Sequence, residues 1–222
     1  MPLQQIFSKK EVSLRSFLQK SLILSVVFFM VACAGSVSTS GSTSNTAVSP
    51  SATIGAQAPV LTNTPTCNGV ATPSQTEGPF YKPNSPQRTS LREPGISGTP
   101  LTITGFVLST TCQPIAHALL DFWQADSNGN YDNTGFRLRG HLYTDNQGRF
   151  SLETIVPGEY PGRTRHIHVK VQASHGPVLT TQLYFPGEAR NDSDGIFSPG
   201  LLMHVQQAHD GELATFNFII AV

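Results

Sequence analysis

The chain has 222 residues, with 14 Lys plus Arg against 14 Asp plus Glu and 38% hydrophobic residues. These values suit one soluble globular domain together with an unstructured segment. Without residues 1–34 the balance becomes 10 basic against 13 acidic side chains, about −3, which argues against a nucleic-acid partner.

The first residues have the layout of an export signal. Four basic side chains between positions 9 and 20 precede a continuous apolar run, residues 22–32, which is too short to span a bilayer comfortably. An amphipathic helix of the mature protein is the alternative, but the run has no helical periodicity. We therefore expect residues 1–34 to be a signal peptide or lipoprotein signal, and the protein to be exported.

Two cleavage sites fit this signal. Cleavage after Ala34 would follow a small-x-small pattern, whereas Met30-Val31-Ala32-Cys33 resembles a bacterial lipobox in which Cys33 becomes the acylated first residue. The lipobox is slightly favoured, although methionine is unusual at its first position. Cys33 is therefore a candidate lipidation site for a membrane-anchored lipoprotein on the cell surface, and a freely extracellular protein is the alternative.

A segment rich in Ser, Thr, Ala and Pro follows the signal. Residues 35–71 carry no charged side chain and little periodic apolar character, so they cannot bury enough surface to order themselves. We expect a flexible tether here and a folded domain over residues 72–222.

The two cysteines beyond the signal, Cys67 and Cys112, form an even pair. Disulfides persist in the compartments that exported proteins reach, so this pair is a candidate disulfide. Two separate buried thiols are the alternative.

Beyond residue 72, short runs rich in β-branched and aromatic residues recur between clusters of Gly, Pro, Asn and Asp, which predicts strands. The predicted strands are Leu101 to Ser109, Ala116 to Ala125, Arg149 to Thr154, His166 to Ala173, Val178 to Phe185 and Ala214 to Ile220. Turn sequences such as Asp145-Asn146-Gln147-Gly148 separate them. Since no long amphipathic helix intervenes, we expect an all-β fold, a β-sandwich of mainly antiparallel strands with long loops.

Two tyrosines and a histidine pair stand out along these strands. Tyr131 follows the turn sequence Ser127-Asn128-Gly129-Asn130, and Tyr160 lies in the loop 157–162. Each has a structural alternative, because an aromatic side chain can anchor a loop and a Pro-Gly-x-Tyr turn also occurs in non-catalytic, carboxypeptidase-regulatory-like sandwich modules.

His166-Ile167-His168 lies within a predicted strand. Side chains alternate between the faces of a strand, so both imidazoles point the same way and Ile167 points into the core. Two nitrogen donors on one face are half of a metal site, and a purely structural pair is the alternative.

Taken in order, these residues resemble the intradiol ring-cleavage dioxygenases, the non-haem ferric enzymes that include catechol 1,2-dioxygenase and protocatechuate 3,4-dioxygenase. The matching residues are Trp123-Gln124-Ala125-Asp126, Tyr131, Tyr160, Arg163-Thr164-Arg165-His166-Ile167-His168 and Gln182. Upstream, Thr72 to Phe80 is similar to the opening segment of protocatechuate dioxygenase subunits. The likeness extends from Thr72 to Phe218, and the leader and cysteine pair look most like the extracellular branch of this family.

The resemblance implies one non-haem Fe(III) per chain, held by the metal ligands Tyr131, Tyr160, His166 and His168. Ferric iron is a hard acid that favours anionic oxygen donors, which two tyrosinates supply. A catechol-type substrate would be cleaved by O2 between its two hydroxylated carbons to a muconate-type dicarboxylic acid. The catalytic residues would be Tyr160, which leaves the iron and accepts a proton; Arg163, which stabilises negative charge on the ring; and Gln182, which hydrogen-bonds nearby.

The chain departs from the family pattern at three places. Thr164-Arg165 replaces the usual Pro-Ala, His117 stands where glycine is common, and Phe80 stands where tyrosine is frequent. Two other functions stay open, a non-catalytic binding module on a surface lipoprotein and a copper or zinc hydrolase. The sequence selects neither one catechol nor an oligomeric state, although family members commonly form homo-oligomers.

The remaining charged and histidine residues are expected to have ordinary structural roles. Asp126 and Asp145 suit turns, because aspartate accepts hydrogen bonds from the backbone that follows it. Four histidines have no partner at ligand spacing and are expected on the surface: His141, His175, His204 and His209.

Overall fold

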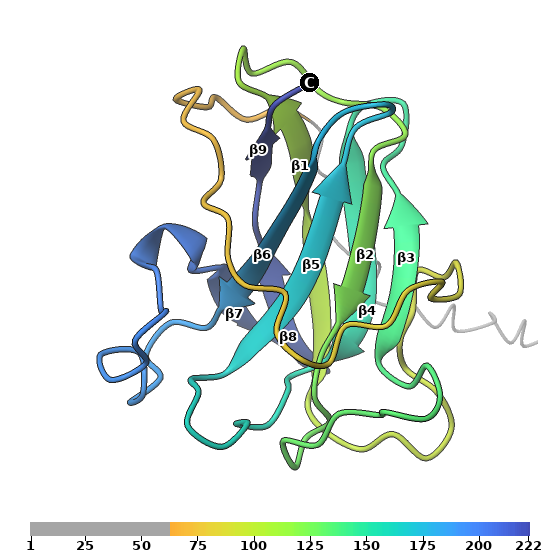
Figure 1. Cartoon of the computed structure of the whole chain (residues 1–222), viewed down its shortest axis with the longest axis vertical. Helices are drawn as coiled ribbons and strands as arrows, with labels where there is room; N and C mark the ends of the chain where they lie inside the picture. Colours follow the sequence, from red (N-terminus) through yellow and green to blue (C-terminus); the bar gives the residue numbers. More distant parts are fainter. Residues whose placement is uncertain (1–62) are drawn as a thin grey trace, which may run out of the picture. The chain divides into compact units, whose positions relative to one another are not determined.

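The computed structural model describes residues 63–222 (Figure 1); the expected signal, Cys33 and most of the expected tether lie outside the described residues. The described part is built from strands, one 3-10 helix (η1, Pro199–Leu201) and long loops. No helix in that part is both long and apolar enough to cross a membrane. The prediction of an all-β sandwich with long loops is therefore confirmed for residues 63–222.

The first sheet has the strand order β4-β1-β8-β7, with β9 also paired to β1. Its strands are β1 (Pro100–Ser109), β4 (Arg149–Ile155), β7 (His204–Ala208), β8 (Gly211–Thr215) and β9 (Phe218–Ile220). β1 runs antiparallel to β4 and parallel to β8 and β9.

The second sheet carries the candidate site and has the order β3-β2-β5-β6, all antiparallel. Its strands are β2 (Leu119–Trp123), β3 (Arg139–Tyr143), β5 (His166–Gln172) and β6 (Val178–Tyr184). The register aligns one residue of each strand in a row across the sheet: Arg139, Trp123, His168 and Gln182. Residues that are distant in sequence are thereby neighbours on one face.

The core lies between the two sheets. Ile103 of β1, Leu120 and Phe122 of β2, and Ile167 of β5 are fully buried within it. Burying each such side chain contributes about 1.5–3 kcal/mol. Since side chains alternate along a strand, the residues next to these core positions, including Trp123 and His168, point to the outer face of the second sheet.

The segment 72–92, called the strap below, covers that outer face (Figure 1). At one end the Gln75 backbone N–H donates to the carbonyl of Thr180 on β6 (2.8 Å), and towards the other end the Arg88 N–H donates to the carbonyl of His141 on β3 (2.9 Å). The strap therefore crosses all four strands of the second sheet.

A disulfide between Cys67 and Cys112, with a Cα–Cα distance of 5.6 Å, ties the chain just before the strap to the turn after β1. Cys67 belongs to the expected tether, so the last residues of that segment are attached to the domain.

Two strands, β3 and β7, were absent from the sequence prediction. Both are edge strands with polar sequences, in which alternation of apolar and polar residues is weak: Arg139-Gly140-His141 in β3 and His204-Val205-Gln206-Gln207 in β7. The predicted strand Ala214 to Ile220 was also wrong, because it is two strands. Asn217 interrupts it, and its Oδ1 accepts a hydrogen bond from the Phe106 N–H (3.0 Å).

Candidate active site

The candidate site lies on the outer face of the second sheet, beneath the strap. His166 and His168 are 4% and 3% exposed, and Ile167 between them is fully buried in the core. The two imidazoles therefore share one face, as the strand period predicts.

The hydrogen bond of His166 to the backbone fixes its tautomer. Its Nδ1 lies 2.6 Å from the carbonyl oxygen of Thr164, which can only accept, so Nδ1 carries the proton and Nε2 presents a lone pair. That Nε2 lies 3.2 Å from Nε2 of His168 and 3.3 Å from Oη of Tyr131. Three donor atoms from two parts of the chain thus converge on one point.

Burial keeps both histidines neutral. It lowers the pKa of His166 to about 4 and lowers the pKa of His168 well below its ordinary value. Neutral imidazoles with free lone pairs are the form that binds metal ions.

Tyr131 reaches the site from the loop after β2. Burial raises its pKa, and the charges of Arg163 and Arg139 act in the opposite direction. The Phe80 ring of the strap stacks on it with centroids 4.4 Å apart and an angle of 13° between the ring planes.

Tyr160 lies beside Tyr131 and Phe80. Its ring centroid is 5.9 Å from that of Tyr131 and 5.2 Å from that of Phe80, both edge to face. The Tyr160 side chain is half-buried. The structure therefore brings all four predicted metal ligands into one cluster. Tyr131, His166 and His168 meet through their polar atoms, whereas Tyr160 joins the cluster through ring contacts.

The donor set suits a hard metal ion. Two ligands at about 2.1 Å from one ion and at right angles lie about 3 Å apart, close to the separations seen between the converging atoms. Within residues 63–222, no three His, Cys, Asp or Glu side chains gather as a metal-binding group. The oxygen donor that the structure places beside the imidazoles is Oη of Tyr131, and an anionic oxygen donor of this kind suits a hard metal ion.

Trp123 and Gly78 hold His168 in place. The Trp123 ring stacks on the imidazole with centroids 4.8 Å apart and an angle of 8°. On the strap, Gly78 has a φ of +72°, and a Cβ added there would lie 3.3 Å from Cε1 of His168. The strap can approach His168 this closely because residue 78 has no side chain.

Arg139 joins the strap to the loop of Tyr131, and sequence reasoning missed it. Its side chain is 1% exposed; Nη1 donates to the carbonyl of Phe80 (2.5 Å), while Nε and Nη2 donate to the carbonyl of Asp132 (3.1 and 2.9 Å). Of the two residues held in this way, Asp132 follows Tyr131 in the chain and Phe80 stacks on its ring. A polar residue at the start of an unpredicted strand gave no signal for this role.

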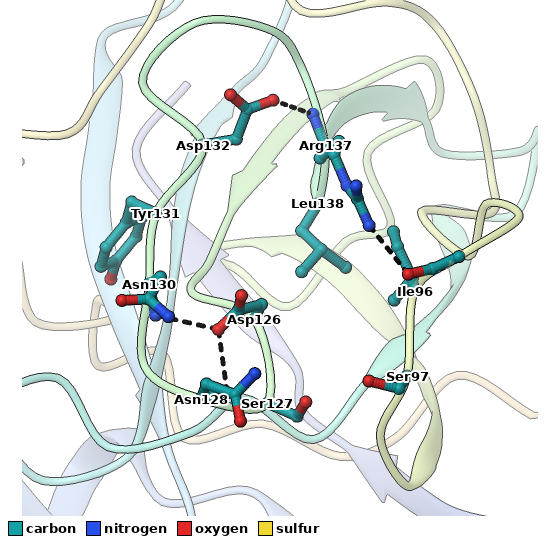
Figure 2. Close-up of a pocket in the computed structure, with 11 residues that line it drawn as sticks. Ile96, Ser97, Asp126, Ser127, Asn128, Asn130, Tyr131, Asp132, Arg137 and Leu138 are labelled. Atoms are coloured by element: carbon teal, nitrogen blue, oxygen red, sulfur yellow. Dashed lines mark hydrogen bonds between the residues drawn. The ribbon is translucent and has the colours of Figure 1, made fainter. Parts of the chain in front are cut away.

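The loop of Tyr131 also borders a cavity of about 300 Å³ (Figure 2). Asp126 accepts hydrogen bonds at Oδ1 from the backbone N–H groups of Asn128 (2.8 Å) and Asn130 (2.9 Å). Asp132 accepts from the backbone of Gly135 and Arg137, and these bonds lower its pKa. The predicted turn role of Asp126 is confirmed, and these contacts shape the loop that carries Tyr131.

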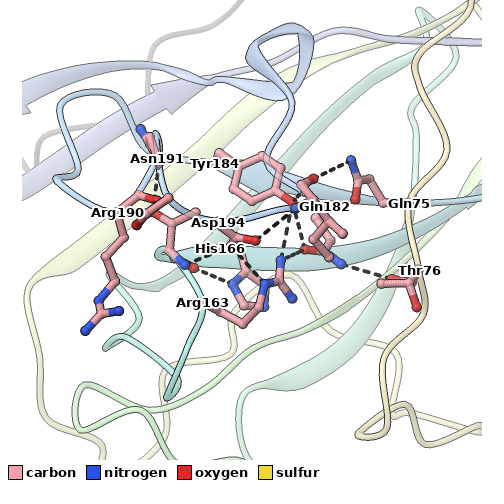
Figure 3. A network of polar contacts seen from close by, with 12 residues as sticks. Gln75, Thr76, Arg163, His166, Gln182, Tyr184, Arg190, Asn191 and Asp194 are labelled. Carbon is pink, nitrogen blue, oxygen red and sulfur yellow. Dashed lines mark hydrogen bonds and ion pairs between the residues drawn. The ribbon is translucent and has the colours of Figure 1, made fainter.

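Arg163 belongs to a polar network at the other end of the site (Figure 3). Its Nη2 donates to Oε1 of Gln182 (2.7 Å) and its Nε to Oδ2 of Asp194 (2.8 Å). Gln182 in turn donates to the carbonyl of Thr76 on the strap (3.0 Å). Arg165 pairs instead with Glu188 (3.5 Å), so the two arginines of this segment have different partners.

The residues outside the cluster have structural contacts. His141, expected on the surface, is instead half-buried on β3 with its Nδ1 2.7 Å from the Ser85 carbonyl, whereas His209 is exposed as expected and pairs with Asp210. His117 has a φ of 56°, a left-handed conformation that glycine adopts without strain. This conformation accounts for the glycine that the resemblance leads one to expect at position 117.

The chain resembles known dioxygenases over most of the described part. A family model described as "Dioxygenase" matches residues 76–218. The solved dioxygenase domain of a dioxygenase carbohydrate-binding protein fusion from Streptomyces sp. SirexAA-E is 57% identical, with a TM-score of 0.68, covering 69% of this chain and 99% of that one.

Two curated relatives are more distant. Chlorocatechol 1,2-dioxygenase of Rhodococcus opacus is 29% identical over 67% of this chain and 72% of its own length. The protocatechuate 3,4-dioxygenase beta chain of Burkholderia cepacia is 33% identical over 45% of this chain and 50% of its own length. The chain thus spans 50% of one of these two relatives and 72% of the other.

Proposed function

The chain belongs to the intradiol ring-cleaving dioxygenases, and from this premise we propose that it cleaves a catechol-type aromatic ring with O2 between the two hydroxylated carbons. The product would be a muconate-type dicarboxylic acid. The observation that carries the proposal is the convergence of His166 Nε2, His168 Nε2 and Tyr131 Oη within 3.2–3.3 Å contacts.

The metal is proposed to be one non-haem Fe(III) per chain, held by Tyr131, Tyr160, His166 and His168. When bound, this ion would bind the two catechol oxygens and activate the ring towards O2. The fixed Nδ1 proton of His166 and its buried, neutral state support this ligand set.

The chain's own residues divide the remaining tasks. Tyr160 is only half-buried and lies at the edge of the cluster, so it is the ligand proposed to leave and to accept a catechol proton at Oη. Arg163 is proposed to stabilise the negative charge that develops on the substrate, and Gln182 to hold that guanidinium. Phe80 and Trp123 pack around the ligands and exclude water from them.

The test is oxygen consumption by the iron-loaded protein with a panel of catechols, together with the product mass. The proposal predicts uptake of one O2 per ring and a product heavier than the catechol by two oxygen atoms. A folded, iron-replete protein that leaves every catechol unchanged would overturn it. A non-catalytic binding module would instead contain no stoichiometric iron.

We also propose that the protein is exported and lipid-anchored through Cys33 at the cell surface. The apolar leader and the lipobox-like Met30 to Cys33 support this, and the Cys67–Cys112 disulfide suits an oxidising compartment. Incorporation of labelled palmitate into the expressed full chain, abolished in Cys33→Ser, is the expected result. An unlabelled wild-type protein released into the medium would favour the freely secreted form.

A further inference from the structure

The Asp194 carboxylate contacts both the Arg163 side chain and the peptide that follows it. Oδ2 accepts hydrogen bonds from Nε of Arg163 (2.8 Å) and from the backbone N–H of Thr164 (2.9 Å), while Oδ1 accepts from the N–H of Ile196 (3.2 Å). The residue is 8% exposed. We propose that Asp194 is a positioning residue, which fixes the Arg163 guanidinium and the peptide that orients His166; its catalytic part rests on the proposed function.

The guanidinium is held from two sides. Asp194 binds Nε, and Gln182 Oε1 (2.7 Å) and Tyr184 Oη (3.4 Å) accept from Nη2. Among the described residues, Nη1 has no protein acceptor. Because the guanidinium is planar, two fixed nitrogens fix the direction of the third, and Nη1 is left for an anionic group of the substrate.

Asp194 also controls the histidine strand through residue 164. The Thr164 N–H donates to Asp194, and the Thr164 carbonyl accepts the Nδ1 proton of His166 (2.6 Å). Thr164 is fully buried, and its hydroxyl donates to Oδ1 of Asn191 (2.7 Å) in the same loop as Asp194. One loop therefore places both the arginine and a proposed metal ligand.

The charge of Asp194 is part of this role. Burial opposes ionisation, but hydrogen bonds from the backbone of Thr164 and Ile196 and from Arg163 keep the pKa of Asp194 below its ordinary value. Arg163 and Asp194 therefore form an ion pair at the border of the site. The Arg163 side chain is 20% exposed and the Asp194 side chain 2%. A neutral residue at 194 would keep the shape and lose the charge-assisted bonds.

Asp145 supplies a matched control outside the site. Its Oδ2 accepts from Nε of Arg149 (2.7 Å) and its Oδ1 from the backbone N–H groups of Gln147 and Arg149 (both 2.9 Å). This is the same combination of an arginine Nε and backbone donors, located in the turn between β3 and β4. Asp145→Asn therefore alters the same set of bonds without touching Arg163, at a carboxylate that is 41% exposed against 2% for Asp194.

The test compares Asp194→Asn with Asp145→Asn in the iron-loaded full chain. For Asp194→Asn we expect kcat to fall about 100-fold with iron content retained, because misplacing a charge-stabilising group by about 1 Å costs this much. On the Arg163→Gln background, Asp194→Asn should add less than about threefold, since the asparagine oxygen still accepts from the Thr164 N–H and the substitution removes only the charge-assisted bond to that arginine. Asp145→Asn should leave kcat unchanged.

A second readout does not require turnover. The Nε–H resonance of Arg163, assigned by its loss in Arg163→Gln, should be protected from exchange in the wild type and in Asp145→Asn but not in Asp194→Asn. An unchanged kcat in Asp194→Asn, full additivity with Arg163→Gln, or a resonance still protected in Asp194→Asn would each overturn the role of Asp194. A wild type that binds iron but cleaves no catechol would overturn the proposed function and the catalytic role of Arg163, while the resonance would still report whether Asp194 holds the guanidinium.

Discussion

Gly78 shows how a single residue without a side chain controls the site. Its φ of +72° costs a non-glycine residue about 1–2 kcal/mol, and a Cβ would meet the His168 imidazole at 3.3 Å. We therefore predict that Gly78→Ala lowers the free energy of unfolding by about 1–2 kcal/mol and also weakens iron uptake, measured by denaturation and by metal analysis.

Gly187 provides the control for that prediction. It has a φ of +74° but nothing within 4 Å of an added Cβ. Gly187→Ala should show the same stability loss with unchanged iron uptake. Equal iron contents in the two variants would contradict a role for the Gly78 backbone in seating His168.

The buried histidine predicts a pH dependence of the metal-free protein. His166 has a pKa of about 4 in the folded protein against 6.5 unfolded, so the unfolded chain binds more protons between these values. The contribution of neutral, buried His166 to the free energy of unfolding is fully present above pH about 6.5 and is lost as the pH falls towards 4. The loss is on the order of 3 kcal/mol. Urea unfolding of the metal-free protein across this range measures it, and His166→Asn should flatten the slope.

Sequence reasoning at the residue scale succeeded where the signal is local. His166 and His168 share a face because they are two positions apart on one strand. Tyr131 and Tyr160 were singled out by the resemblance, and the ligand role of all four residues stays a prediction. Asp194 and Arg139 gave no signal, because their partners are distant in sequence and are brought close only by folding. Asp194, for instance, binds a side chain 31 positions away. Gly78 lies in the segment Thr72 to Phe80 that the resemblance singled out, but no role was predicted for it.

At the scale of elements, the strap and the loop of Tyr131 depend on Arg139. Arg139→Met should lower the free energy of unfolding by about 3 kcal/mol or more, because the carbonyls of Phe80 and Asp132 lose all the hydrogen bonds that the 1%-exposed arginine donates to them. Arg137→Met, which removes an exposed arginine from the same loop, should cost less than about 1 kcal/mol. Similar losses in the two variants, measured by urea unfolding, would show that Arg139 does not hold the strap to the loop of Tyr131.

Strand prediction succeeded for runs rich in β-branched and aromatic residues and failed for the two polar edge strands, β3 and β7. β5 alternates apolar and polar residues because one face packs on the core, and β6 is recognisable from its β-branched and aromatic residues. β3 and β7 are edge strands with polar sequences, and their pairing depends on neighbours distant in the chain. The row of aligned residues from Arg139 to Gln182 could therefore not be predicted, because it includes β3, which the sequence pattern did not indicate.

At the scale of the whole molecule, the disulfide restrains the start of the domain. It joins residues 45 positions apart, and on the chain-entropy model such a link contributes about 4 kcal/mol. The variant Cys67→Ser/Cys112→Ser should lose stability of this order in guanidinium unfolding and retain its kcat, because the bridge lies apart from the ligands. A loss of kcat in the folded variant would show that the bridge supports the site.

We propose that two tyrosines and two histidines hold one ferric ion, and the visible absorption spectrum of the iron-loaded protein is the decisive measurement. The wild type should be coloured by a broad tyrosinate-to-iron charge-transfer band, and Tyr131→Phe and Tyr160→Phe should each change that band. The matched variant Tyr143→Phe, on the exposed end of β3, should leave it unchanged. A colourless, folded, iron-replete wild type, or a band that survives both ligand substitutions unaltered, would show that Tyr131 and Tyr160 do not bind the iron.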